Sequence, residues 1–343
     1  MSVIENINIS SINQIISPEI LKNRLRINDE LKEKVSNYRS EINDIINKKS
    51  NKIVAIIGPC SVSNYESTLE YAEELKEISK EYDNILIVMR VYVEKPRTRT
   101  GWKGYLYDPD LNESNDINKG IELSRKLMLE ITKLGLPIAT EFLNLNTPQY
   151  FDDLVSWACV GARTVESQLH RELASGLSMP VGFKNTTNGD VNKAIDAIIT
   201  CESNHTFFGM NHQGNCAIIK TKGNNNGHLI LRGSSISPNY YKEDVEKSIN
   251  ILNNNKINRG LIIDCSHGNS KKNYKNQKIV AESIMKQNNK NIIGFMLESF
   301  MLEGNQKIEH SKQNSINDMN PNISITDECI DLEETKNILN LFK

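Results

Sequence analysis

Eight short apolar runs, each followed by a side chain capable of chemistry, constrain the fold of this 343-residue chain more than any other feature. The runs, with the residues that follow them, are 53–57 before Gly58-Pro59-Cys60, 85–89 before Arg90, 137–140 before Glu141, 158–162 before Arg163, 180–183 before Lys184, 229–231 before Arg232, 261–265 before Ser266-His267 and 292–297 before Glu298. Helix-like segments separate most of the runs. This order predicts an eight-stranded (β/α) TIM barrel, in which all strand C-termini open onto the face that carries the active site. The basic residues on that face suit an acidic, phosphorylated ligand.

Residues 1–50 contain no strand-like run, so we expect an N-terminal extension followed by a catalytic barrel domain at 51–343. Ser17 before Pro18 predicts the start of a first helix. A second helix is predicted by an apolar stripe at helical spacing, formed by Leu31, Val35, Tyr38, Ile42 and Ile45. The stripe is expected to pack on the barrel or on another subunit, and the extension can serve packing, assembly or regulation.

Two further strand-like segments, 205–210 and 217–221, complicate the strand count. The few residues between them are too short for a parallel crossover, so a β-hairpin inserted at about 205–221, outside the barrel, is expected. If both were barrel strands instead, the eight-stranded topology would be wrong.

Composition excludes several classes of protein. The net charge is −2, whereas a broad nucleic-acid-binding surface needs a basic excess. No apolar run is long enough to cross a membrane, and residues 1–9 do not resemble a secretory signal. The six cysteines form no C-x-x-C pair, which is typical of reduced thiols. A cytoplasmic protein without membrane or nucleic-acid partners is therefore expected.

Four residues near strand ends could bind one divalent metal ion. Cys60, His267 and Glu298 follow three different runs, and Asp327 lies beyond the last one. Thiolate, imidazole and carboxylate groups are ligands for Mn, Fe, Co, Zn or Cu, and the sequence does not select among these metals. Taken singly, Cys60 also fits a buried structural thiol, and His267 also fits a hydrogen-bonded core histidine.

A cation-rich segment at 90–104 follows the second run. Pro96 stiffens it and Gly101 and Gly104 permit close backbone approach, so it can hold Lys95, Arg97 and Thr98 as a phosphate clamp. A solvated basic loop is the alternative. Further cations are expected at the same face: Arg163, Lys184 and Arg232. So many like charges would repel one another without an anion to bind, which favours an acidic ligand. No glycine-rich nucleotide-binding motif occurs.

At these residues the chain resembles the type I 3-deoxy-D-arabino-heptulosonate 7-phosphate (DAHP) synthases of the microbial, feedback-regulated branch, and most closely their tyrosine-sensitive form. The matching segments are 57–61, 89–98, 101–104, 161–168, 170–185, 264–270, 303–306 and 324–327. They extend over nearly the whole chain.

The resemblance implies a transferase that condenses phosphoenolpyruvate with erythrose 4-phosphate and releases phosphate, the first step of the shikimate pathway to chorismate and the aromatic amino acids. It implies that Cys60, His267, Glu298 and Asp327 bind one divalent metal ion. The residues implied to hold phosphoenolpyruvate are Arg90, Lys95, Arg163, Lys184 and Arg232, and Arg97 and Thr98 are implied to hold the phosphate of erythrose 4-phosphate. Lys95 is the candidate donor of a proton to the new alkoxide, with a metal-bound water as the rival and a purely electrostatic role as a third possibility.

The resemblance also implies feedback inhibition by an aromatic amino acid outside the barrel mouth. The matching positions are Leu145, Pro148, Gln149, Leu173, Leu177, Ser178, Phe207 and Gly209, which ordinary packing would also explain. Gly209 lacks side-chain bulk and could leave room for a phenol hydroxyl, which favours tyrosine over phenylalanine. A homodimer or homotetramer is expected, because the stripe from Leu31 to Ile45 indicates association.

Two other functions are compatible with parts of this pattern. One is a related phosphoenolpyruvate-dependent sugar-acid synthase that uses arabinose 5-phosphate, against which the segment Lys95–Thr98 argues. The other is a non-catalytic barrel that senses aromatic amino acids. A sensor would not need four metal ligands and clustered cations.

Overall fold

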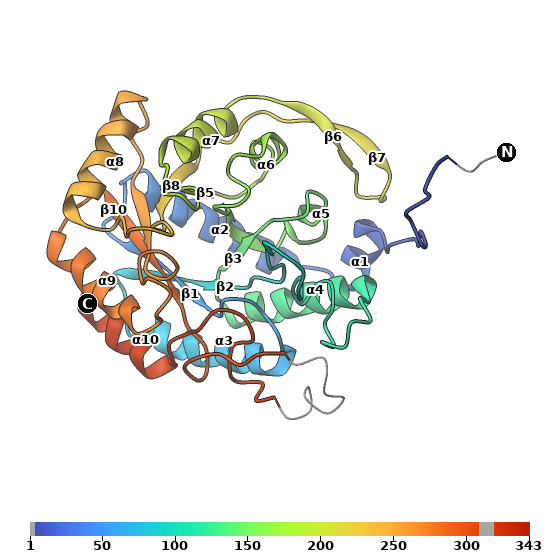
Figure 1. Cartoon of the computed structure of the whole chain (residues 1–343), viewed down its shortest axis with the longest axis horizontal. Coiled ribbons are helices and arrows are strands. Elements are labelled where there is room, and N and C mark those ends of the chain that lie inside the picture. Colours follow the sequence, from blue (N-terminus) through green and yellow to red (C-terminus); the bar gives the residue numbers. More distant parts are fainter. Residues whose placement is uncertain (1–3, 309–318) are drawn as a thin grey trace.

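The structure, a computed structural model describing residues 4–308 and 319–343, contains a closed barrel of eight parallel strands (Figure 1). The barrel strands are β1 (Ile53–Gly58), β2 (Ile85–Arg90), β3 (Ile138–Glu141), β4 (Val155–Val160), β5 (Val181–Lys184), β8 (Gly227–Leu231), β9 (Leu261–Asp264) and β10 (Ile292–Glu298). They pair in chain order, and β10 closes the barrel onto β1. The predicted TIM-barrel fold is confirmed.

Helices alternate with the barrel strands and lie outside them (Figure 1). They are α3 (Tyr65–Ser79), α4 (Ile117–Leu134), α5 (Pro148–Phe151), α6 (Gln168–Ala174), α7 (Asn192–Glu202), α8 (Lys242–Asn254), α9 (Asn276–Gln287), α10 (Leu332–Leu339) and a final 3-10 turn, Asn340–Phe342. Local sequence sets several of their ends. Asn64 and Asp116 cap the N-termini of α3 and α4, and Gly135 ends α4 in the left-handed conformation that glycine adopts most easily. None of the helices in the described part of the chain is long and apolar enough to span a membrane.

One strand differs from its expected position. The run 158–162 was predicted to form a strand ending at Arg163, but β4 ends at Val160. Residues 155–157 belong to the strand because Val155 and Trp157 are fully buried and Trp157 pairs with Ala139 of β3. Arg163 consequently lies in the following loop, where it is exposed.

The N-terminal extension forms α1 (Pro18–Arg24) and α2 (Asp29–Ile46), with Ser17 capping α1 as expected. The apolar face of α2 packs against the barrel of its own chain. Ile42, Ile45 and Ile46 are fully buried in one cluster with the barrel interior, including Val54 and Trp157. Burying each isoleucine contributes roughly 1.5–3 kcal/mol. The stripe therefore closes one end of the barrel, and it no longer argues for association between subunits.

The hairpin β6 (Thr206–Met210) and β7 (Cys216–Lys220) is antiparallel and stands outside the barrel. In Figure 1 it arches past α6 toward the N-terminal helices. Its turn reaches α1, because the backbone N–H of Glu19 donates to the carbonyl of His212 at 2.8 Å. Its outer face exposes Phe208 and Ile218.

Candidate active site

A cavity of about 410 Å³, which we call the mouth, opens at the C-terminal ends of the barrel strands. It is lined by every residue that the sequence proposed for metal or substrate: Cys60, Arg90, Lys95, Arg97, Thr98, Arg163, Lys184, Arg232, His267, Glu298 and Asp327. The parallel register explains the convergence, because Gly58 of β1 lies beside Glu298 of β10. Active sites of TIM barrels lie at this end.

Cys60, Glu298 and Asp327 form a cluster in which one donor atom from each lies within 4.8 Å of the others. His267 is next to it, with Nε2 at 3.6 Å from Oε1 of Glu298. The amine of Lys95 lies 2.7 Å from the Cys60 sulfur and 3.2 Å from Oδ2 of Asp327. The sulfur and oxygen donors of this cluster, with the nitrogen of His267 beside Glu298, are ligand types that fit a borderline divalent metal.

Electrostatics supports a cation at this point. Burial, together with the charge of Glu298, raises the pKa of the Cys60 thiol to about 12. Burial also acts to raise the pKa of Asp327, but Lys95 and His267 outweigh it and leave that pKa below its ordinary value. The cluster thus gathers acidic groups around a small volume, and a bound divalent cation would favour the thiolate form of Cys60.

Two local conformations place these donors. Gly58 has φ +155°, and a Cβ there would lie 2.7 Å from the backbone oxygen of Arg90. Only glycine permits this approach between β1 and β2 just before Cys60. His267 has φ +55°, a left-handed conformation uncommon outside glycine, which turns its ring back toward the mouth.

The mouth also has a cationic lining, which we call the cationic wall, formed by Arg90, Arg163, Lys184 and Arg232. Arg90 is buried and donates from Nη2 to Oε1 of Glu298 at 3.2 Å, while its Nη1 has no hydrogen-bond partner among the described residues. Lys184 is paired with Asp264, whose carboxylate oxygen lies 2.9 Å from Nζ. Burial lowers the pKa of Arg232, Asp264 opposes that shift, and Arg163 lowers the pKa further. Nη1 of Arg90 is a buried donor that an anionic ligand could satisfy. Such a ligand would also offset the repulsion between Arg163 and Arg232.

Residues 94–107, the clamp loop, fold as one unit at the edge of the mouth. The N–H of Lys95 donates to the carbonyl of Lys103 at 2.8 Å, and Nε of Arg97 donates to the carbonyl of Trp102 at 2.6 Å. A side chain on Gly104 would collide with the backbone of Val93 and Glu94. Arg97 and Thr98 remain exposed and face the cavity.

Sequence reasoning missed two buried carboxylates that support the mouth. Glu94 accepts hydrogen bonds from the N–H groups of Leu143 and Asn144, from Thr147 and from Tyr107. Burial raises its pKa to about 7, although these hydrogen bonds act in the opposite direction. Asp264 is fully buried, and Lys184 and His267 overcome the effect of burial and hold its pKa well below the ordinary value. Each stands near a predicted site residue in the sequence: Glu94 directly precedes Lys95, and Asp264 follows an apolar run three residues before His267.

The eight positions expected to bind an effector lie on three elements near the hairpin (Figure 1). Leu145, Pro148 and Gln149 lie in or just before α5; Leu173, Leu177 and Ser178 lie in or just after α6; Phe207 and Gly209 belong to β6. A Cβ on Gly209 would lie 2.7 Å from Cγ1 of Ile219. The space beside Gly209 is therefore filled by Ile219, and this glycine gives no support for a phenol pocket.

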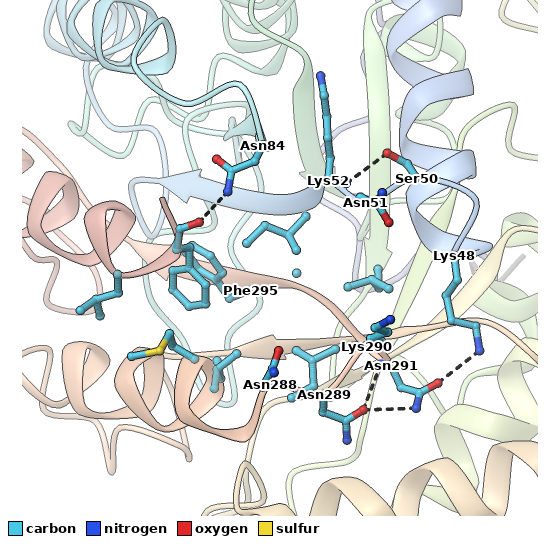
Figure 2. A pocket seen from close by; sticks show the side chains of 18 of the residues that line it. Lys48, Ser50, Asn51, Lys52, Asn84, Asn288, Asn289, Lys290, Asn291 and Phe295 are labelled. Carbon is cyan, nitrogen blue, oxygen red and sulfur yellow. Dashed lines mark hydrogen bonds between the residues drawn. The ribbon is translucent and has the colours of Figure 1, made fainter.

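A larger cavity, about 880 Å³, lies at the other end of the barrel and is not the candidate site. We call it the basal hollow; it is lined mainly by residues 48–53, 284–295 and 341–343 (Figure 2). One of its lysines is bonded to asparagines, since Nζ of Lys48 lies 2.7 Å from Oδ1 of Asn258 and 3.2 Å from Oδ1 of Asn291. It lies at the strand N-termini, where TIM barrels do not carry catalysis.

Comparisons with known proteins show which family the chain belongs to. The sequence pattern of the DAHP synthetase I family matches residues 26–340. The chain is 43% identical over 340 residues to the Tyr-sensitive phospho-2-dehydro-3-deoxyheptonate aldolase of Escherichia coli K12, covering 98% of this chain and 94% of that protein. It is 40% identical over 343 residues to the Trp-sensitive enzyme of the same organism, covering 99% and 97%. The solved structure of phospho-2-dehydro-3-deoxyheptonate aldolase from Francisella tularensis SCHU S4 is similar at a TM-score of 0.94 and 45% identity, covering 97% of each chain.

Proposed function

The chain belongs to the DAHP synthetase I family, and from this premise we propose how the residues of its mouth carry out the family's reaction. The protein is a DAHP synthase, a transferase that joins phosphoenolpyruvate, erythrose 4-phosphate and water to give DAHP and inorganic phosphate. This is the feedback-regulated first step of the shikimate pathway. The observation that carries the proposed residue roles is the convergence of an acidic cluster and a cationic wall in one cavity of about 410 Å³.

The family is metal-dependent, and we propose Cys60, His267, Glu298 and Asp327 as the ligands of one divalent ion. The donor atoms of Cys60, Glu298 and Asp327 already lie within 4.8 Å of one another, which supports this assignment. Mn, Fe, Co, Zn and Cu all accept such a mixed set. When bound, the metal supplies Lewis-acid polarisation of the erythrose 4-phosphate aldehyde.

Phosphoenolpyruvate is held, in this proposal, by the cationic wall. Its carboxylate and phosphate are assigned to Arg90, Lys95, Arg163, Lys184 and Arg232. Nη1 of Arg90, which has no partner among the described residues, is available to such an anion. Holding two polyanions together in one orientation lowers the barrier by positioning and by electrostatic stabilisation.

The phosphate of erythrose 4-phosphate is assigned to Arg97 and Thr98 on the clamp loop. The enol carbon of phosphoenolpyruvate attacks the aldehyde carbon, which turns the aldehyde oxygen into an alkoxide. Positive charge develops at C2 of phosphoenolpyruvate, where water adds before phosphate leaves. We assign delivery of a proton to the alkoxide to Lys95, because its amine lies 2.7 Å from the Cys60 sulfur and 3.2 Å from Oδ2 of Asp327, within the cluster proposed to bind the metal.

Feedback inhibition is assigned to an aromatic amino acid at Leu145, Pro148, Gln149, Leu173, Leu177, Ser178, Phe207 and Gly209. Tyrosine is proposed as the effector because of the similarity to Tyr-sensitive relatives. Because another relative is Trp-sensitive, tryptophan is the main alternative effector. Isothermal titration calorimetry with tyrosine, phenylalanine and tryptophan tests this choice. Binding of phenylalanine or tryptophan by a protein that does not bind tyrosine would contradict it.

We further propose a cytoplasmic homodimer or homotetramer in which residues 1–50 serve assembly. Six free cysteines fit a reducing compartment. Ile4, Ile7 and Ile12 in the N-terminal arm are 82%, 69% and 77% exposed, and contact with another subunit would bury these apolar side chains. Light scattering that gives the mass of a monomer would contradict the oligomer.

The reaction is tested with purified protein, phosphoenolpyruvate and an aldose panel containing erythrose 4-phosphate and arabinose 5-phosphate. We expect loss of phosphoenolpyruvate with erythrose 4-phosphate only, abolished by EDTA and restored by Mn²⁺. Turnover with arabinose 5-phosphate would favour the related synthase. No turnover with any divalent metal would favour the amino acid sensor, and turnover insensitive to EDTA would remove the proposed metal role.

A further inference from the structure

Asp264, the last residue of β9, lies between a proposed phosphoenolpyruvate ligand and a proposed metal ligand. Its side chain is fully buried. Oδ2 lies 2.9 Å from Nζ of Lys184 and 3.0 Å from Nδ1 of His267. One carboxylate oxygen therefore touches both halves of the mouth, and such a buried charge is tolerated only because it is paired and hydrogen-bonded.

The second oxygen of Asp264 determines which nitrogen of His267 carries a hydrogen. Oδ1 accepts from the N–H of Ser266 at 3.0 Å and lies 2.6 Å from the Ser266 hydroxyl, which is 2.7 Å from Nδ1 of His267. An ionised carboxylate only accepts, so the single hydroxyl hydrogen of Ser266 goes to Asp264. Nδ1 of His267 must then carry the ring hydrogen, which it donates to the serine oxygen, with Oδ2 of Asp264 at 3.0 Å.

This tautomer leaves Nε2 of His267 as the nitrogen with a free electron pair. Nε2 points to the acidic cluster, 3.6 Å from Oε1 of Glu298. Metal-binding histidines commonly have their other ring nitrogen held by a carboxylate in this way.

The backbone around Asp264 holds the arrangement in place. The side-chain amide of Asn269 donates to the carbonyls of Asp264 and Leu231, at 2.8 and 3.1 Å. The N–H of Gly268 donates to the carbonyl of Arg232 at 3.1 Å. These bonds tie the left-handed turn at His267 to the ends of β8 and β9, so the turn cannot reorient without breaking them.

We propose that Asp264 is a positioning residue that serves two functions with one carboxylate. It directs the amine of Lys184 toward the phosphoenolpyruvate anion, and it presents Nε2 of His267 to the metal. The inference rests on the proposed function above. It requires that loss of Asp264 weakens metal binding even when no substrate is present, and that it also weakens phosphoenolpyruvate binding.

The test is the substitution Asp264→Asn, which keeps the shape and removes the charge. Calorimetric titration of the full-length protein with Mn²⁺, without substrates, is expected to show a Kd raised roughly 10- to 100-fold. The KM for phosphoenolpyruvate, measured at saturating Mn²⁺, is expected to rise as well, more than the KM for erythrose 4-phosphate. Asp153→Asn is the matched control, because Asp153 also pairs with a buried cation, Arg125 at 2.7 Å, and lies among residues that do not line the mouth. Its Mn²⁺ affinity should equal that of the wild type.

A second variant keeps the test decisive if Asp264→Asn does not fold, as judged by near-ultraviolet circular dichroism. Ser266→Ala removes one hydrogen bond to Asp264 and one acceptor of the Nδ1 hydrogen. It should raise the Mn²⁺ Kd by a smaller factor, roughly two- to tenfold.

The outcomes separate the two levels of the proposal. A wild-type protein that binds no Mn²⁺ overturns the proposed metal site and this inference with it. A wild-type protein that binds Mn²⁺, together with a folded Asp264→Asn variant of equal Mn²⁺ affinity, overturns the positioning role alone. A raised Mn²⁺ Kd with an unchanged KM for phosphoenolpyruvate overturns the shared role.

Discussion

The two ends of the barrel both carry lysines, yet they hold them in opposite ways. At the mouth, the side chain of Lys184 is 5% exposed and pairs with the fully buried Asp264, and Arg90, 1% exposed, pairs with the buried Glu298. At the basal hollow, Lys52 pairs with Glu41 while the two side chains are 44% and 33% exposed. Lys48 there contacts asparagine side chains instead of carboxylates (Figure 2).

This contrast separates the cations of the candidate site from ordinary surface lysines by their burial and by the charge of their partners. Exposed ion pairs contribute little and can form wherever lysines are abundant. A buried cation has a large desolvation cost, which is tolerated only with a placed counter-charge. The mouth therefore differs from the basal hollow through its buried counter-charges, although the basal hollow has the larger volume.

The largest expected effect is on stability when Arg90 loses its charge. Arg90→Met leaves Glu298 buried without its partner at 3.2 Å, and we expect the free energy of unfolding to fall by about 3–5 kcal/mol. Urea denaturation in EDTA measures this change. The double variant Arg90→Met/Glu298→Gln should recover part of the loss, because it removes both charges. If the free energy of unfolding of Arg90→Met lies within about 1 kcal/mol of the wild type, the buried ion pair of the mouth contributes no more than an exposed pair. That result would contradict the difference proposed between the two ends of the barrel.

An intermediate effect is expected at Glu94, a buried carboxylate of the mouth that accepts hydrogen bonds from neutral donors. Burial raises the pKa of Glu94 from an ordinary 4.5 to about 7. Between pH 4.5 and pH 7, the carboxyl group is therefore protonated in the folded protein and ionised in the unfolded chain. Stability contributed by this group is therefore lost as the pH rises from 4.5 to 7, by up to about 1.4 kcal/mol per pH unit. The Glu94→Gln variant has no titratable group at this position, so it lacks this contribution to the pH dependence of stability.

Denaturant unfolding of both proteins at several pH values between 5 and 8 checks this prediction. The stability of the wild type relative to Glu94→Gln should decline up to about pH 7 and level off above it. Glu122→Gln, on the exposed side of α4, controls for the general loss of a carboxylate. A pH-independent difference between wild type and Glu94→Gln would contradict the raised pKa.

The smallest effect is expected at the basal hollow. Lys52→Met removes the exposed ion pair with Glu41, 2.9 Å long, and should change the free energy of unfolding by less than about 1 kcal/mol. Both KM values and kcat should match the wild type. If steady-state kinetics of Lys52→Met show a raised KM for either substrate, this prediction is contradicted, and a change at the basal hollow alters substrate binding at the mouth.

Much of the architecture could be predicted from the sequence because apolar runs and helical spacing recur in a strict order. The barrel, the two N-terminal helices and the outside hairpin follow from local patterns. The position of β4 did not, since residues 155–157 mix Ser156 with buried apolar side chains and only pairing with β3 reveals the strand.

The sequence predicted which residues gather in the candidate site, but it did not predict how they contact one another. Strand ends and motifs indicated the residues that line the mouth. They did not indicate that Asp264 connects Lys184 with His267, because that contact joins residues 80 positions apart along the chain. The same limit applies to Gly209, whose space is taken by Ile219 across the hairpin.

The central claim is that the acidic cluster of the mouth binds the metal on which the condensation depends. Anomalous diffraction at the manganese edge, from crystals soaked with Mn²⁺ and phosphoenolpyruvate, tests it most directly. The account predicts one strong peak between Cys60, His267, Glu298 and Asp327, with phosphoenolpyruvate density against Arg90 and Lys184. A peak elsewhere, or no peak in crystals of protein that is active with Mn²⁺, would contradict the assignment.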